Sequence, residues 1–104
     1  MKFNGQTLPR AARLRLSYSP NTGSGCVRSL IASWDFCTHE EAHKLLAAVR
    51  GPVTVELLDP ATKMAVSMVC GLVHSRLEEA KHGWKNLEIM LREDPNTYYS
   101  EVNV

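Results

Sequence analysis

The residues with the clearest chemical pattern in this sequence are two histidines, His39 and His43, four positions apart. The pentapeptide from His39 to His43 matches the motif H-E-x-x-H, in which both histidines lie on one helix face and bind zinc while the glutamate acts as general base. A third protein ligand would have to come from another acid or histidine, with four candidates later in the chain: His74, His82, Glu78 and Glu79. This pattern would make the protein a zinc hydrolase.

The residues around the motif favour a different interpretation. Thr38 and Glu41 form the capping-box pattern T-x-x-E, which marks the start of a helix. Protease motifs of this kind usually carry an uncharged residue at the position of Glu41, and here that position is an acid used by the capping box. His39 would then lie in the first helical turn, whereas metal ligands are better held where packing locks them. We therefore rank zinc hydrolysis third, with His39 and His43 as its metal ligands, and predict a protein with no cofactor that is not an enzyme.

A second pattern is basic, and its four arginines lie in the first third of the chain: Arg10, Arg13, Arg15 and Arg28. Residues 1–37 carry five Lys/Arg against one Asp, a balance of 5 − 1 = +4, and residues 38–104 carry seven against ten, a balance of 7 − 10 = −3. Guanidinium groups suit phosphate, because they donate paired hydrogen bonds. The alternative function is therefore an anion-binding domain for nucleic acid or a cyclic dinucleotide, although mutual neutralisation across a folded sheet is the simpler explanation.

Arginines placed ahead of β-structure make the chain loosely similar to PilZ domains, which bind cyclic di-GMP through an N-terminal arginine motif before a β-barrel. The segment Arg10-Ala11-Ala12-Arg13 departs from their RxxxR spacing, and their D/N-x-S-x-x-G element is missing. The resemblance implies a cyclic dinucleotide as one ligand of the anion-binding alternative, and it does not assign the chain to that family.

The basic residues would be positioned by a hairpin. Residues 12–18 alternate, with Leu14, Leu16 and Tyr18 on one face, and alternation is typical of a half-buried strand. Residues 20–25 are turn formers, and residues 26–36 alternate again, so that Trp34 and Phe36 are expected in the core.

The histidines would be positioned by a helix over residues 39–50. After the capping box, Ala42, Leu45, Leu46 and Val49 form one apolar stripe, and Gly51-Pro52 ends the helix.

The rest of the chain predicts further strands at residues 53–57, 64–77 and 87–91. The long strand has apolar residues on both sides, which favours a central position, and Gly71 within it indicates a bulge or bend. Residues 72–82 could also be helical, but we expect the bent strand and then a charged loop through Gly83. Residues 1–9 are expected to be a loose leader, and residues 98–104 a tail or edge strand.

The predicted fold class is therefore α+β, with a five-stranded, mainly antiparallel sheet and one helix in the order ββ-α-βββ. A sharply bent fourth strand could instead roll the sheet into a partly open barrel. With 104 residues, the chain fits a single domain, 1–104.

The cysteines and the apolar runs of the sequence indicate the cellular compartment that is expected for the protein. The three cysteines, Cys26, Cys37 and Cys70, form no CxxC pair and are expected to be free thiols of a cytoplasmic protein. No apolar run is long enough to span a membrane, and the first residues do not resemble a secretory signal, so no membrane partner is expected.

The leading functional hypothesis is a small non-catalytic interaction module that binds a protein partner. An exposed sheet edge could pair with another strand, and Trp84, which follows a glycine in a charged loop, could anchor an interface or cap the sheet edge. A homodimer through a sheet edge or through Trp84 is a further alternative. Accessory proteins of phages and mobile elements, including inhibitors of host defence, often have this size and type.

Overall fold

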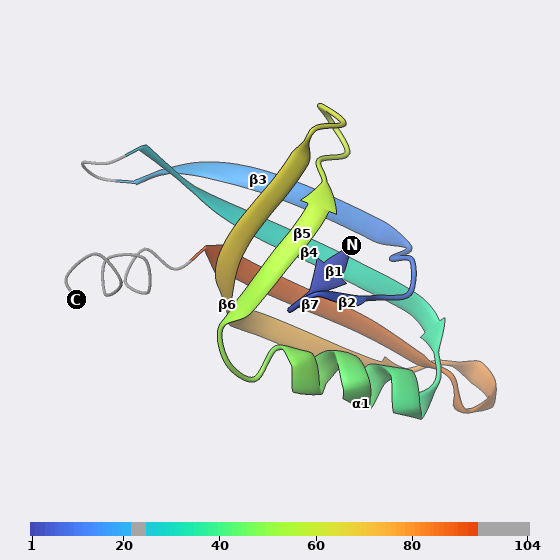
Figure 1. The fold of residues 1–104 in the computed structure, drawn as a ribbon. Coiled ribbons are helices and arrows are strands. Elements are labelled where there is room, and N and C mark those ends of the chain that lie inside the picture. The colour runs from blue at the N-terminus through green and yellow to red at the C-terminus, as the bar shows by residue number, and fades with distance from the viewer. Residues whose placement is uncertain (22–24, 94–104) are drawn as a thin grey trace.

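The computed structural model describes residues 1–21 and 25–93, which form one helix and one mainly antiparallel, open sheet (Figure 1). The elements follow the chain as β1 (Lys2–Phe3), β2 (Gln6–Thr7), β3 (Arg13–Asn21), β4 (Gly25–Cys37), α1 (His39–Ala48), β5 (Val53–Leu58), β6 (Ala65–Glu79), the 3₁₀ turn η1 (Lys81–Gly83) and β7 (Lys85–Glu93). The strand order across the sheet is β2-β1-β5-β6-β7-β4-β3. The class is α+β as predicted, but the described residues form seven strands rather than five, in the order ββββ-α-βββ.

The long strand β6 belongs to two parts of the sheet. Its residues Ala65 to Cys70 pair with β5, and its residues from Cys70 to Glu79 pair with β7. A register shift between Leu72 and His74 marks a bulge near the point where the partner changes. We call β2, β1, β5 and the first part of β6 the short half, and the second part of β6 with β7, β4 and β3 the long half. Figure 1 shows the short half running across the long half.

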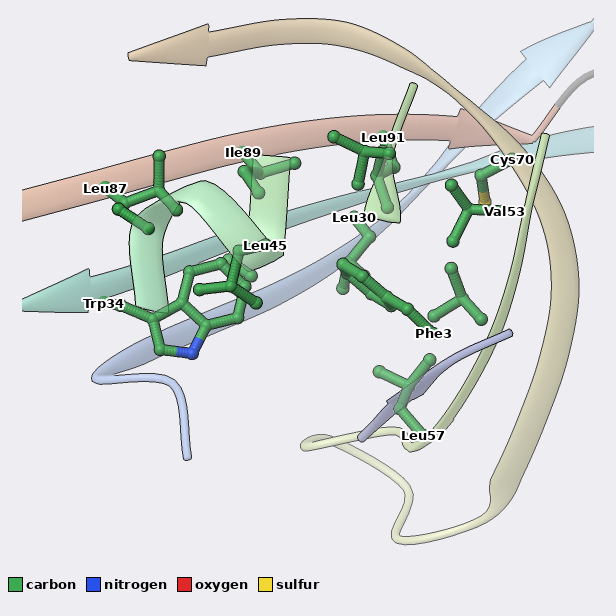
Figure 2. Packing of buried hydrophobic residues seen from close by; sticks show 14 of the residues in the cluster. Phe3, Leu30, Trp34, Leu45, Val53, Leu57, Cys70, Leu87, Ile89 and Leu91 are labelled. Atoms are coloured by element: carbon green, nitrogen blue, oxygen red, sulfur yellow. The ribbon is translucent and has the colours of Figure 1, made fainter. Parts of the chain in front are cut away.

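The core lies between these two halves. The short half contributes Phe3, Val53, Val55, Leu57, Met68 and Cys70, and the long half contributes Leu30, Ala32, Trp34, Cys37, Leu87, Ile89 and Leu91. Figure 2 shows side chains from both halves converging, with Leu45 of α1 among them. The helix adds its predicted apolar stripe, because Ala42, Leu45 and Val49 are all buried. The helix and the sheet thus enclose one apolar cluster.

Residues 1–9 were wrongly expected to be a loose leader. They contain β1 and β2, the two strands that the prediction lacked. They form a hairpin in which Asn4 and Gly5 take positive φ values of 51° and 80°, as a two-residue turn of the type favoured by Asn-Gly requires. The hairpin is joined to β5, since the Asn4 N–H donates to the carbonyl of Thr54 at 2.8 Å. Phe3 is only 1% exposed, so the N-terminal hairpin completes the core.

The first predicted hairpin is confirmed as β3 and β4, but Phe36 was wrongly expected in the core. A bulge between Trp34 and Cys37 adds one residue to β4, and Phe36 takes a positive φ of 57° there. The extra residue shifts the alternation by one, so Cys37 is buried in its place and Phe36 is 62% exposed.

The predicted helix is confirmed together with its capping box. The Thr38 hydroxyl accepts from the Glu41 N–H, and the Glu41 carboxylate accepts from the Thr38 N–H, both at 3.1 Å. This hydrogen bonding lowers the pKa of Glu41. The helix ends at Ala48 rather than residue 50, because Val49 leaves helical geometry as the C-cap.

The remaining predictions are partly confirmed. The second part of β6 is strand up to Glu79, not helix, and the loop after it contains η1. The sheet is strongly bent but does not close into a barrel, since within residues 1–21 and 25–93 β2 and β3 each pair with only one strand. The possible edge strand at 98–104 lies outside the described residues. In the described part of the chain, no helix is both long and apolar enough to cross a membrane.

The buried position of Phe3 predicts that the N-terminal hairpin stabilises the fold. Replacing Phe3 by alanine should lower the free energy of unfolding, measured by urea denaturation, by about 3–5 kcal/mol, because a large buried ring leaves a cavity. Lys2→Ala, which changes an exposed neighbour on the same strand, should alter it by less than about 0.5 kcal/mol. A Phe3 variant as stable as the Lys2 variant would contradict this role for the buried ring.

Candidate functional site

The four arginines predicted as an anion site do not form one cluster. Arg13 and Arg15 lie on the outer face of β3, opposite Ser33 and Ile31 of β4, and are exposed. Arg28 lies two residues before the buried Leu30 on β4, and alternate residues of a strand share a face, so Arg28 lies on the core side of the sheet. Arg10 lies in the segment that joins β2 to β3. The hairpin therefore divides its positive charge between two faces.

Arg28 is part of the connection between the two halves of the sheet. Its Nε donates to Oε2 of Glu93 at 3.2 Å, and its backbone N–H donates to Oε1 of the same carboxylate at 3.4 Å. A terminal nitrogen of the guanidinium also donates to the carbonyl of Ser67, in the first part of β6, at 3.4 Å. The two side chains are 28% and 26% exposed. The hydrogen bond with Glu93 raises the pKa of Arg28, and the guanidinium is occupied by the protein itself.

A second polar contact joins the same two halves. The Tyr18 hydroxyl on β3 donates to Oδ2 of Asp59, just after β5, at 3.1 Å. Asp59 also accepts the N–H of Ala61 at 2.9 Å, and that backbone hydrogen bond is the main reason that the pKa of Asp59 lies below its ordinary value. The contact raises the pKa of Tyr18. Tyr18 is therefore tied to the turn after β5.

The outer face of the long half carries nearly balanced charge. The strand registers place four arginines on it, Arg13, Arg15, Arg76 and Arg92, and three acids, Asp35, Glu78 and Glu88, a balance of 4 − 3 = +1. Arg13 pairs with Asp35 at 3.3 Å, and Arg76 pairs with Glu78 at 3.4 Å. A shallow hollow on this face is lined by side chains of both signs. This face is mixed in charge rather than a basic surface.

The two histidines of the H-E-x-x-H motif lie together at the start of α1. Their ring centroids are 4.2 Å apart, and both side chains are exposed in the first turns of the helix. Within the described ranges, no group of three or more His, Cys, Asp and Glu side chains is arranged to hold a metal ion. His39 and His43 therefore form a pair without a third ligand among these residues.

Two of the cysteines are buried thiols. Cys37 donates to the carbonyl of Lys85 at 3.3 Å, and burial raises its pKa. Burial also raises the pKa of Cys70, to about 11. Because the thiolate is the reactive form of cysteine, both side chains are protonated at neutral pH and are suited to packing.

The feature that the sequence reasoning missed is the free edge of the second part of β6. Every residue from Leu72 to Glu79 is exposed, and in the described part of the chain this segment pairs only with β7. The apolar residues on both sides of β6 suggested a central strand, but only Cys70 has partners on both sides. The pairing with β5 ends and the pairing with β7 begins at Cys70, so an edge is left where a central strand was expected. We call residues Leu72–Glu79 the β6 edge.

Trp84 lies at the end of the loop that follows the β6 edge. It is the C-cap of η1 and is 42% exposed. The Ala80 N–H donates to the Trp84 carbonyl at 2.8 Å, and Lys85 pairs with Glu79 across the base of the loop. Trp84 is therefore held by its backbone beside the β6 edge, with part of its ring surface accessible.

The position of Arg28 predicts a structural role rather than a ligand-binding one. Replacing Arg28 by methionine should lower the free energy of unfolding by about 1–3 kcal/mol, because Glu93 is left partly buried without its charged partner. Arg15→Met, on the exposed outer face, is the matched control and should change it by less than about 0.5 kcal/mol. Urea denaturation of the two variants measures the difference, and an Arg28 variant as stable as the control would contradict the structural role.

Comparisons of the chain with protein-family models, with curated proteins and with solved structures find no match.

Proposed function

We propose that this protein is a non-catalytic interaction module that binds another protein chain by adding a strand to the β6 edge. The observation that carries the proposal is the run of eight exposed residues on a strand with β7 as its one described partner there. An edge of this kind presents unpaired backbone N–H and C=O groups to an incoming strand. Main-chain hydrogen bonds supply affinity in such complexes, and alternate side chains supply specificity.

The side chains of the β6 edge fit this role. Leu72 and Leu77 are 42% and 41% exposed, and Val73 at the bulge is 54% exposed. Leu77 is flanked by two charged residues, Arg76 and Glu78, which share the outer face. Charges on an edge discourage indiscriminate pairing, so a partner that presents complementary charges is favoured. Trp84 at the neighbouring loop adds an accessible aromatic surface of the kind common in interface anchors.

The state of the titratable groups supports a non-catalytic role. The buried thiols have raised pKa values, and Glu41, which stands at the first x position of the H-E-x-x-H motif, is engaged in the capping box. Accessory and inhibitor proteins of phages and mobile elements often have this size and architecture, and a cytoplasmic role of that kind, exerted through a protein partner, belongs to the proposal.

Anion binding is the second candidate, and it depends on the outer-face arginines Arg13 and Arg15. Their exposure favours it, but the acids on the same face reduce the attraction. Titration with single-stranded DNA, RNA and cyclic di-GMP at low salt tests it, with Arg13→Ala plus Arg15→Ala as the variant. We expect at most weak binding that salt abolishes; binding that survives physiological salt and is lost in the double variant would establish the anion site instead.

The proposed function predicts that a charge on the β6 edge abolishes partner binding. Leu77→Lys places an ammonium group where a partner strand would pack, and it should reduce recovery of the co-purifying protein at least about tenfold, the effect of roughly 1.4 kcal/mol. The measurement is affinity purification of the tagged full chain from its own host, with the bound protein quantified by mass spectrometry.

Leu58→Lys is the matched control, because Leu58 is an exposed leucine at the end of β5, away from the β6 edge. Its partner recovery should equal that of the wild type. If both lysine variants retain the same partner, the β6 edge is not the binding site. If no protein co-purifies with the wild-type chain and the chain does not associate with itself, the proposed function loses its support.

A further inference from the structure

We propose that the strand added to the β6 edge is the same edge of a second copy, so that the protein forms a two-fold symmetric dimer with Leu77 on the axis. This inference rests on the proposed function, because it names the partner of the same edge. The two copies would pair antiparallel, Leu77 opposite Leu77 of the other copy, and would join two open sheets into one. A two-fold interface of this kind presents the same residues on both sides.

The charges of the β6 edge select this register. With Leu77 opposite its own copy, Arg76 of each chain lies opposite Glu78 of the other, which gives two cross-strand pairs of opposite charge. A shift by two residues in one direction places Arg76 opposite Arg76, and in the other direction it places Glu78 opposite Glu78. Directly opposed like charges destabilise antiparallel strands, whereas opposite charges stabilise them. Arg76 also lies opposite Glu88 of β7, so it would sit between two carboxylates.

The apolar side of the edge agrees with the same register. Leu77 lies opposite Leu87 of β7, which in turn lies opposite Trp34 of β4. Leu87 and Trp34 are buried, while Leu77 at the end of this row is 41% exposed. Two Leu77 side chains facing each other across the axis would continue the row from one core to the other. The dimer would therefore cover apolar surface that the described part of a single copy leaves accessible.

The other long edge of the sheet lacks this complementarity. Strand β3 pairs only with β4 among the described residues, and its outer face carries Arg13 and Arg15 without an acid on the same strand. Antiparallel self-pairing of β3 would set arginine opposite arginine or opposite serine. Of these two edges in the described residues, the β6 edge combines exposed leucine with charges of opposite sign, and it is therefore the edge that fits a second copy.

The register predicts a specific disulfide. Directly opposed residues of antiparallel strands have Cα atoms about 4.5–5.5 Å apart, within the range that a disulfide bridges. In a Cys26→Ser background, Leu77→Cys should therefore form a covalent dimer under mild oxidation. Ser75→Cys on the same strand is the control, because its two copies would be offset by roughly 14 Å along the strand axis at about 3.4 Å per residue. Non-reducing gel electrophoresis at several protein concentrations measures both.

A charge exchange tests the same contact without cysteine. Arg76→Glu alone or Glu78→Arg alone should raise the dimer dissociation constant, measured by analytical ultracentrifugation, by roughly tenfold, because two attractive pairs become repulsive. The double variant Arg76→Glu plus Glu78→Arg restores the pairs and should bring the constant back to within about threefold of the wild type, the scatter typical of such couplings. Arg15→Glu makes the same change of charge on β3, which β4 and β7 separate from β6 in the sheet, and should have no effect.

The outcomes separate this inference from the proposed function. A wild-type chain that sediments as a monomer at every concentration, while a host protein still co-purifies and is lost in Leu77→Lys, overturns the dimer and leaves the binding edge in place. A dimer that cross-links through Ser75→Cys but not Leu77→Cys, or that the double charge variant does not restore, also overturns it. Cross-linking at position 77 together with restoration by the double variant confirms it.

Discussion

The structure depends on one constraint, which is that a single strand, β6, serves both halves of a bent sheet. Its first part pairs with β5 and its second part with β7, and the change of partner occurs around Cys70 and Gly71. Because the two halves then cross, the apolar face of each becomes the cover of the other, and α1 completes the enclosure (Figure 1). The removal of these faces from water is the main favourable term in folding, so the bend in β6 is what turns a set of amphipathic strands into a protein with a core.

The crossing also determines where the polar side chains are used. At one end, Arg28 of β4 reaches Glu93 of β7 and the backbone of Ser67 in β6, and Tyr18 of β3 reaches Asp59 after β5. Partly buried charges are tolerated when they are paired and hydrogen-bonded. Part of the positive charge in the first third of the chain therefore makes internal contacts. The rest of this charge lies on an outer face, where acidic side chains from β4, β6 and β7 offset it.

The same change of partner has a consequence at the surface. Because each part of β6 pairs on one side, the strand that lies in the middle of the sheet order still exposes an edge from Leu72 to Glu79. Natural sheets usually protect such edges by bulges and charges, and both occur here, the bulge at Leu72/His74 and the charges at Arg76 and Glu78. Charges of opposite sign two residues apart complement an antiparallel copy of the same strand, whereas a strand with like charges at the facing positions is disfavoured. We therefore see the edge as selective rather than blocked, which is the basis of the proposed interaction module.

The sequence by itself determined the features that depend on near neighbours in the chain: the capping box at Thr38 and Glu41, the apolar stripe of α1 and the alternation of the strands. The N-terminal hairpin was also encoded locally, in Asn4-Gly5, but two-residue strands give no alternation to detect. Only the tertiary structure decided that Arg28 pairs internally, that Phe36 points outwards and that, among the described residues, the β6 edge pairs with β7 alone. These three features depend on which distant strand lies beside a given strand and on where a bulge shifts the strand register. The alternation of residues along one strand carries no information about its neighbour or about the position of a bulge.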